Sequence, residues 1–415
     1  MTDSLTELVE FTQANSPFYR HLYAAATSPV RLADLPIIDQ AEFWAANTLH
    51  DNRLLTGTPG DGVIFKTGGT TGKPRMSWYT ADEWKDMCRT FATGLAPAGV
   101  RPGDRVANLY YVGELYASFI FTHNVLQEAP FDVLQLPIAG NSPLSFTVPA
   151  LQDFAATVVA GFPTSLVELA QRVRETIGTL PAVRLLLFSG EPFYDDQRGT
   201  LAEAFPHATI KSIGYGSVDG GALGAPVAES DDVRVFRAFR PTRIIEVVDV
   251  ETGRPIEEPG QPGRLLLTDL SRRLMPMIRY PLGDLGEWVD YGEGTYRLLG
   301  RADESARIGL VSLNLAPLRT AAAEATDAPI DGFQVVVRRS ATGDQLILRI
   351  AADVPDRDRA TRTVRAKISS MFPRFADQVA KGAIAPMAVE WVAPTSIVTN
   401  PRTGKALRLI DERPI

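Results

Sequence analysis

Apolar positions along the first half of the chain alternate between two spacings. Short apolar runs predict buried strands at residues 63–65, 106–111, 156–160, 185–188 and 209–213. Helical spacing predicts helices at residues 5–15, 39–44, 82–94, 115–126 and 165–177. Strands that alternate with helices predict a parallel sheet with helices on its faces.

The pattern changes after about Gly216. Residues 244–249 and 263–268 predict antiparallel strands, joined by a Gly/Pro-rich turn. After Asp303 the chain restarts as a small α+β unit. Its expected elements are a hairpin of residues 333–338 and 345–350, a helix at 357–372 and a strand at 388–392. We therefore predict an α/β fold: a large N-terminal domain of mixed and parallel β-sheets with flanking helices over residues 1–302, and a small mobile α+β domain over residues 303–415.

Composition narrows the class of protein. The 415 residues, 45% of them apolar, suffice for a core in each domain. A formal net charge of −7 argues against a general nucleic-acid binder. The single cysteine, Cys88, excludes an internal disulfide framework and a multi-cysteine zinc cage, and we expect it to be buried as a small apolar residue. Because neither a signal peptide nor a membrane span is visible, we expect a cytoplasmic protein with no membrane partner.

The strongest local signal follows the strand at residues 63–65. It is a loop of glycines and hydroxyl residues ending in a lysine: Thr67, Gly68, Gly69, Thr70, Thr71, Gly72 and Lys73. Its backbone N–H groups can point inward at phosphate, and the hydroxyls and the ammonium add donors. The Walker A pattern is excluded, because it needs glycine at Thr67 and serine or threonine at Pro74. Taken alone, the loop could also be a flexible surface turn.

This loop resembles the phosphate loop of the adenylate-forming superfamily, which includes acyl-CoA synthetases, peptide-synthetase adenylation domains and luciferases. Further motifs of that superfamily follow in the expected order: Ser-Gly-Glu-Pro-Phe at 189–193, Gly-Tyr-Gly-Ser-Val-Asp at 214–219, Arg-Tyr-Pro-Leu-Gly-Asp at 279–284, Gly-Arg-Ala-Asp at 300–303 and Thr-Gly-Lys at 403–405. Each motif is weak alone, but their common order is a strong signal.

Within the superfamily, the likeness is greatest to the phenylacetate–CoA ligase branch. It rests on the stretches at residues 16–20, 250–253, 275–280 and 404–411. The resemblance implies ATP-dependent adenylation of a small acid with release of pyrophosphate, followed by transfer to an acceptor such as CoA or a carrier protein. A homodimer is a further candidate assembly. Because some relatives act in antibiotic pathways, we expect a place in secondary or aromatic-acid metabolism.

The resemblance also implies roles for individual residues. Lys405 would bridge the acid and the α-phosphate, and Arg301 would contact ribose or phosphate. Asp284 would hold the ribose hydroxyls, Asp219 would bind Mg²⁺ and Asp303 would be the hinge. The other expected nucleotide-binding residues are Ser189, Gly190, Glu191, Pro192, Gly214, Tyr215 (stacked on adenine), Gly216 and Ser217. Outside such motifs, a residue like Lys405 would be a surface lysine and one like Asp303 a helix cap.

The sequence departs from the family pattern at three places. Asp219 stands where the superfamily usually has glutamate, and Gln40 replaces a lysine common in the phenylacetate branch. The stretch at residues 304–309 is shorter than usual and lacks the basic residue before its glycine. Because that stretch helps to form the acyl-transfer arrangement in relatives, this departure bears on the thioester step.

An aromatic-rich run at residues 110–119 predicts the acid pocket, because aromatic walls suit a flat aryl acid. The expected pocket residues are Tyr111, Gly113, Glu114, Tyr116 and Tyr215. Plain core packing is the alternative for this run, and Glu114 would either receive an amine or hydroxyl of the substrate or cap a helix. Two other functions fit the same motifs: a nitrite-activating, diazo-forming enzyme acting on an aryl amine, and a non-catalytic nucleotide-binding protein.

Overall fold

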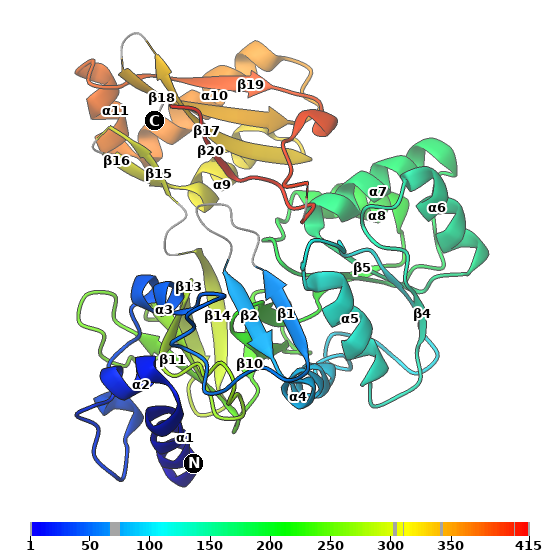
Figure 1. Cartoon of the computed structure of the whole chain (residues 1–415). Coiled ribbons are helices and arrows are strands. Elements are labelled where there is room, and N and C mark those ends of the chain that lie inside the picture. Colours follow the sequence, from blue (N-terminus) through cyan, green and yellow to red (C-terminus); the bar gives the residue numbers. More distant parts are fainter. Residues whose placement is uncertain are drawn as a thin grey trace.

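The computed structural model (Figure 1) describes residues 2–66, 75–301, 305–309, 311–340, 343–401 and 403–413. A five-stranded parallel sheet lies in the first half of the chain. Its strands, in the order β4-β3-β5-β6-β7, are β4 (Leu134–Leu136), β3 (Arg105–Asn108), β5 (Val158–Gly161), β6 (Leu185–Phe188) and β7 (Thr209–Ser212). Every strand pair in this sheet is parallel, so the predicted parallel sheet is confirmed.

Successive residues of these strands bury opposite faces of the sheet. Val106, Val158 and Leu185 belong to one hydrophobic cluster, which includes residues of α4 (Ala81–Ala92) and α5 (Ser118–Gln127). Their neighbours Ala107, Val159 and Leu186 belong to another, which includes residues of α6 (Leu144–Asp153), α7 (Pro163–Thr176) and α8 (Gln197–Ala204). The alternation follows from the two-residue period of a strand and places helices on both faces.

Two predicted boundaries near residue 110 are wrong. The strand expected at residues 106–111 ends at Asn108, whose side-chain amide donates to the Phe119 carbonyl (3.1 Å). The helix expected from residue 115 begins at Ser118, because Glu114 (φ 48°) and Leu115 (φ 62°) have left-handed backbones that no helix accepts. Hydrophobic periodicity does not reveal such turns.

The predicted antiparallel region after Gly216 is a seven-stranded sheet. Its strands, in the order β11-β12-β13-β14-β10-β9-β8, are β11 (Arg243–Val248), β12 (Gly263–Asp269), β13 (Tyr280–Asp290), β14 (Thr295–Arg301), β10 (Val235–Ala238), β9 (Gly221–Pro226) and β8 (Tyr215–Ser217). The N-terminal helices α1 (Thr2–Asn15), α2 (Pro17–Leu22) and α3 (Gln40–Ala46) pack on its core. A separate antiparallel pair, β1 (Val63–Lys66) and β2 (Met76–Tyr79), flanks residues 67–74.

The C-terminal part of the chain has a core of its own, drawn from residues 306–391. Its four-stranded sheet has the order β19-β18-β17-β20: β19 (Ala385–Trp391), β18 (Gly343–Ala351), β17 (Gly332–Ser340) and β20 (Leu409–Asp411). The other elements are the pair β15 (Ser305–Ile308) and β16 (Val311–Asn314) and the helices α9 (Leu315–Thr326), α10 (Arg357–Met371) and α11 (Pro373–Ala380). The predicted hairpin and the helix at 357–372 are confirmed, and so is the fold class.

Figure 1 shows this C-terminal part, in yellow to red, as a separate body beside the two larger sheets. The predicted boundary at residue 302 lies among residues outside the described ranges and stays a prediction. Cys88 is 1% exposed, as expected. Within the described ranges, no helix combines the length and apolarity that crossing a membrane requires.

Candidate active site

Lys405 lies far from the other motifs in sequence but beside one of them in space. A tight turn bends the chain before it: the Gly404 N–H donates to the Asn400 carbonyl (2.8 Å), and Gly404 has a φ of 69°. The Lys405 Nζ lies 5.2 Å from the centre of the Phe162 ring. It also lies against Gly190, where a Cβ would be 2.9 Å from Nζ. The structure therefore brings Lys405 to the predicted Ser-Gly-Glu-Pro-Phe motif.

Two side chains of the larger part hold the turn that carries Lys405. The Glu191 carboxylate accepts hydrogen bonds from the Ala406 N–H (2.8 Å) and from the Thr164 N–H (3.1 Å) and hydroxyl (2.7 Å) near the start of α7. The Tyr111 ring packs on Gly404 so closely that a Cβ there would lie 2.1 Å from ring carbon Cε2. Glycine is therefore required at position 404, and the predicted pocket residue Tyr111 lies against the lysine turn.

A second group of predicted residues meets on the antiparallel sheet. Asp284 of β13 and Arg301 of β14 are opposite each other in register, with Arg301 Nη1 3.8 Å from Asp284 Oδ1. The Tyr215 hydroxyl donates to Asp284 Oδ2 (2.5 Å). Burial, and then the nearby Asp284 charge, raise the Tyr215 pKa well above its ordinary value. Tyr215 therefore stays protonated and keeps the Asp284 carboxylate oriented.

Asp219, the predicted metal ligand, is held by the buried Tyr280, which in turn contacts the half-buried Trp44 and Gln40. The Tyr280 hydroxyl donates to Asp219 Oδ2 (2.7 Å) and is itself approached by the Trp44 Nε1 (3.1 Å) and Gln40 Nε2 (3.2 Å) donors. Gln40, which departs from the family's lysine, also donates to the Pro281 carbonyl (2.5 Å). The sequence analysis did not predict these hydrogen bonds around Asp219, because the residues that make them are separated by up to 240 positions.

The Asp219 site has a donor set suited to Mg²⁺ bound together with a phosphate ligand. Among the described residues, no group of three or more His, Cys, Asp or Glu side chains could hold a metal ion. Mg²⁺ is usually held by one or two carboxylates together with substrate phosphates rather than by a protein cage. One oriented carboxylate matches that preference, so the residues present fit the ion.

The glycines of the Gly-Tyr-Gly motif serve the packing of the protein itself. A Cβ at Gly214 would lie 2.5 Å from the Phe91 ring, and one at Gly216 would lie 2.9 Å from the Gly221 carbonyl oxygen. Ser217 Oγ accepts a hydrogen bond from the Gly220 N–H (2.8 Å). These contacts fix the backbone around Tyr215, so the motif has a structural reason beside its expected nucleotide role.

No described contact places the remaining predicted pocket residues beside Lys405. Tyr116 is buried in the hydrophobic cluster beneath α5, and Gly113 and Glu114 are exposed. Glu114 does not cap α5, because the N-cap of that helix is Ala117. The turn at residues 113–115 instead meets the end of β1, where the Lys66 N–H donates to the Leu115 carbonyl (2.9 Å).

Some predicted site residues are not placed beside the nucleotide motifs by any described contact. Pro192 lines a cavity between the larger part and the C-terminal part, and Ser189 follows the end of β6 directly. The phosphate loop (residues 67–74) and the hinge residue Asp303 lie outside the described residues, so their roles stay predictions.

Comparisons with known proteins agree with the motifs and with the fold. No protein-family model matches the chain. The phenylacetate–coenzyme A ligase of Thermus thermophilus is 28% identical over 371 residues, covering 85% of this chain and 81% of that ligase. A 2-hydroxyisobutyryl-CoA ligase crystallised in the postadenylation state with R3-HIB-AMP has a TM-score of 0.74 at 22% identity, covering 99% of this chain and 88% of that one. In its thioesterification state, with 2-HIB-AMP and CoA, the same ligase has a TM-score of 0.63 at 23% identity, covering 99% of this chain and 89% of that one.

The sequence relatives come from the same group of proteins that the ordered motifs resemble, and the solved structures have the same fold as this chain. The predicted resemblance to the phenylacetate–CoA ligase branch of the adenylate-forming superfamily is confirmed, and the sequence relatives that the chain matches over most of its length are acid–CoA ligases.

Proposed function

We propose that this protein adenylates a small carboxylic acid with ATP and then transfers the acyl group to CoA. One observation carries the proposal: the Lys405 ammonium lies against Gly190, two residues beyond the end of β6. Ligands of open α/β sheets bind beyond the carboxyl ends of the strands. A cation delivered to that edge from the C-terminal part of the chain suits a reaction between two anions.

The reaction needs positioning and positive charge more than covalent help from the protein. A carboxylate oxygen attacks the α-phosphorus, the bond to pyrophosphate breaks, and negative charge spreads over the phosphoryl oxygens. Lys405 would approach both anions, Asp284 would accept hydrogen bonds from the ribose hydroxyls, and Arg301 would contact ribose or phosphate. Mg²⁺, held by Asp219 and the phosphates, would neutralise phosphate charge.

We propose that the acid is aromatic. The Phe162 ring lies beneath the Lys405 ammonium. The centre of the Phe162 ring is 5.0 Å from that of Tyr110 and 6.2 Å from that of Tyr111. Rings are common walls for flat apolar ligands. An aryl acid whose carboxylate meets Lys405 would have its ring near this aromatic group.

We propose further that the C-terminal part, from about residue 303, rotates between the two half-reactions. This chain has the greater likeness to the relative in its postadenylation state, with TM-scores of 0.74 against 0.63. Rotation would carry Lys405 away from Gly190 and expose the acyl adenylate to CoA.

Pyrophosphate release measured with a panel of aryl and short aliphatic acids tests the proposal. Each acid is assayed with ATP and Mg²⁺, with and without CoA, and thioester is quantified in parallel. We expect acid-dependent pyrophosphate release with an aryl acid and thioester only when CoA is present. Release only with nitrite and an aryl amine would replace this function by diazo formation, and absence of ATP binding in calorimetry would contradict both.

A further inference from the structure

The loop that follows β6 carries three carboxylates, and two of them, Glu191 and Asp196, hold the C-terminal part. Glu191 accepts the Ala406 N–H (2.8 Å), next to Lys405. Five residues later, Asp196 accepts the Ile330 N–H (2.7 Å). Gly190, at the start of the same loop, meets the Lys405 amine. One short segment of the larger part thus touches both the reactive lysine and the body that carries it.

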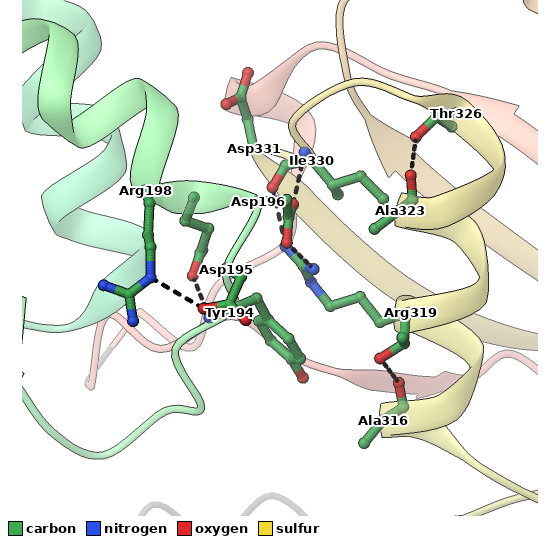
Figure 2. A network of polar contacts seen from close by, with 12 residues as sticks. Tyr194, Asp195, Asp196, Arg198, Ala316, Arg319, Ala323, Thr326, Ile330 and Asp331 are labelled. Carbon is green, nitrogen blue, oxygen red and sulfur yellow. Dashed lines mark hydrogen bonds and ion pairs between the residues drawn. The ribbon is translucent and has the colours of Figure 1, made fainter. Parts of the chain in front are cut away.

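Asp196 makes the stronger of the two attachments. Arg319 of α9 donates to both Asp196 oxygens, at 2.6 and 2.9 Å, and to the Ile330 carbonyl (3.0 Å). Its guanidinium lies 3.7 Å from the centre of the Tyr194 ring. Figure 2 shows the Arg319 side chain reaching from its helix to Asp196, which also faces the Ile330 backbone. We call Tyr194, Asp196, Arg319 and Ile330 the docking cluster.

The docking cluster is shielded from water, although a small cavity separates the larger part from the C-terminal part beside it. The side chains of Arg319 and Asp196 are 6% and 16% exposed. A cavity of about 50 Å³ lies next to them, lined from the larger part by Thr164 and Gln197 and from the C-terminal part by Phe333, among others. Bidentate, desolvated pairs fix geometry well, whereas polar interfaces that leave space between two bodies permit them to separate.

We propose that Asp196 and Arg319 are positioning residues that hold the C-terminal part in the arrangement for adenylation. The inference rests on the proposed function. The pair touches neither Lys405 nor its turn, but it fixes the body from which Lys405 extends, so the position of Nζ at Gly190 depends on it. If the C-terminal part rotates for thioester formation, Arg319 leaves Tyr194 and Asp196. The docking cluster therefore favours the first half-reaction only.

The test compares two neighbouring aspartates in the full-length protein. Asp196→Asn removes the charge that faces Arg319. Asp195→Asn is the matched control, because Asp195 is 92% exposed and its partner Arg198 belongs to the same part of the chain. Adenylation is measured as phenylacetate-dependent pyrophosphate exchange, or with whichever aryl acid the panel selects. Thioester formation is measured separately, from chemically prepared acyl adenylate and CoA.

Loss of one partner of a buried charge pair weakens protein contacts by about 10- to 100-fold or more. We expect Asp196→Asn to slow adenylation by at least about 10-fold, with thioester formation unchanged or faster and Asp195→Asn like the wild type. Equal losses in both half-reactions would show a merely structural role and overturn the proposal. Unchanged adenylation would overturn it as well.

Hydrogen exchange separates failure of the docking idea from failure of the proposed function. The Ala406 N–H bonds to Glu191, which Asp196→Asn leaves intact. Faster exchange at Ala406 in Asp196→Asn would therefore report release of the whole body, and unchanged exchange there would overturn the proposal even if no acid were adenylated. If Asp196→Asn does not fold, Arg319→Met, which keeps the length and apolar packing of the side chain, takes its place with the same expected results.

Discussion

Two aspartate–arginine pairs in this protein have the same chemistry and opposite settings. Asp284 and Arg301 lie on adjacent strands of one sheet, 3.8 Å apart, and the Arg301 side chain is 40% exposed. Asp196 and Arg319 join two parts of the chain at 2.6 Å, and the Arg319 side chain is 6% exposed. The first pair is too far apart for a direct hydrogen bond, which suits a ligand that comes between or beside the two groups. The second is bidentate and desolvated, which suits a fixed contact.

The largest expected effect comes from Lys405→Ala. This change tests whether the chemistry of the proposed site can be lost while the Asp196–Arg319 contact is kept. Because the amine is the positive group proposed to meet both anions, adenylation should fall about 10²- to 10³-fold, as for the loss of one transition-state donor. The docking cluster does not include Lys405, so hydrogen exchange at Ile330 should stay as in the wild type. Rates come from pyrophosphate exchange.

Lys381→Ala is the control for that change, because Lys381 is an exposed lysine of the same part that pairs locally with Asp377. It should leave adenylation unaltered. An equal loss in both lysine variants would remove Lys405 from the proposed site.

A smaller effect is expected from Asp284→Asn, which weakens the Asp284–Arg301 pair and leaves the docking cluster intact. Hydrogen bonds to charged groups contribute about 1.5–3 kcal/mol, so the KM for ATP should rise about 10- to 100-fold while exchange at Ile330 and Ala406 stays unchanged. Asp290→Asn at the end of β13 is the control, since Asp290 is exposed and its side chain accepts a local turn bond from the Glu293 N–H. A KM for ATP that does not change would contradict the proposed ribose contact.

Much of the Asp284–Arg301 region could be predicted from the sequence, because its residues occur in contiguous motifs. Tyr215, Asp284 and Arg301 each stand in such a motif, and β13 and β14 then bring the last two together. Spacing of apolar residues also predicted the parallel sheet. The motif carrying Lys405 was visible in the same way, but its contact with Gly190 depends on how two separate bodies pack.

The docking side was missed for a physical reason. Arg319 lies in a helix rich in alanine that the hydrophobic pattern did not reveal, and a single arginine there is indistinguishable from a solvated one. Asp196 directly follows another aspartate, Asp195, which is 92% exposed. Only tertiary packing decides that one of these neighbours is desolvated and paired across 123 positions while the other remains in water. The Gln40–Tyr280–Asp219 support was missed for the same reason.

The smallest expected effect concerns a third carboxylate beside the docking cluster. Asp331 receives a long hydrogen bond from the Thr200 hydroxyl (3.5 Å), and Figure 2 shows it next to Ile330 and Asp196. Burial raises the pKa of Asp331, the charges of Asp196 and Asp353 raise it further, and Thr200 and Arg174 lower it. The folded protein therefore holds this proton more tightly than the unfolded chain does.

A raised carboxyl pKa means that stability from this group is present at low pH and is lost as pH rises from about 4, the ordinary aspartate value. Asp331→Asn cannot ionise, so its thermal midpoint should match the wild type below that pH and exceed it slightly above. The gain should level off once Asp331 is fully ionised in the wild type. Thermal melts of both proteins in a pH series give the difference directly. A gain that is already present at the lowest pH would mean that the difference comes from packing and not from ionisation of the buried Asp331 carboxyl.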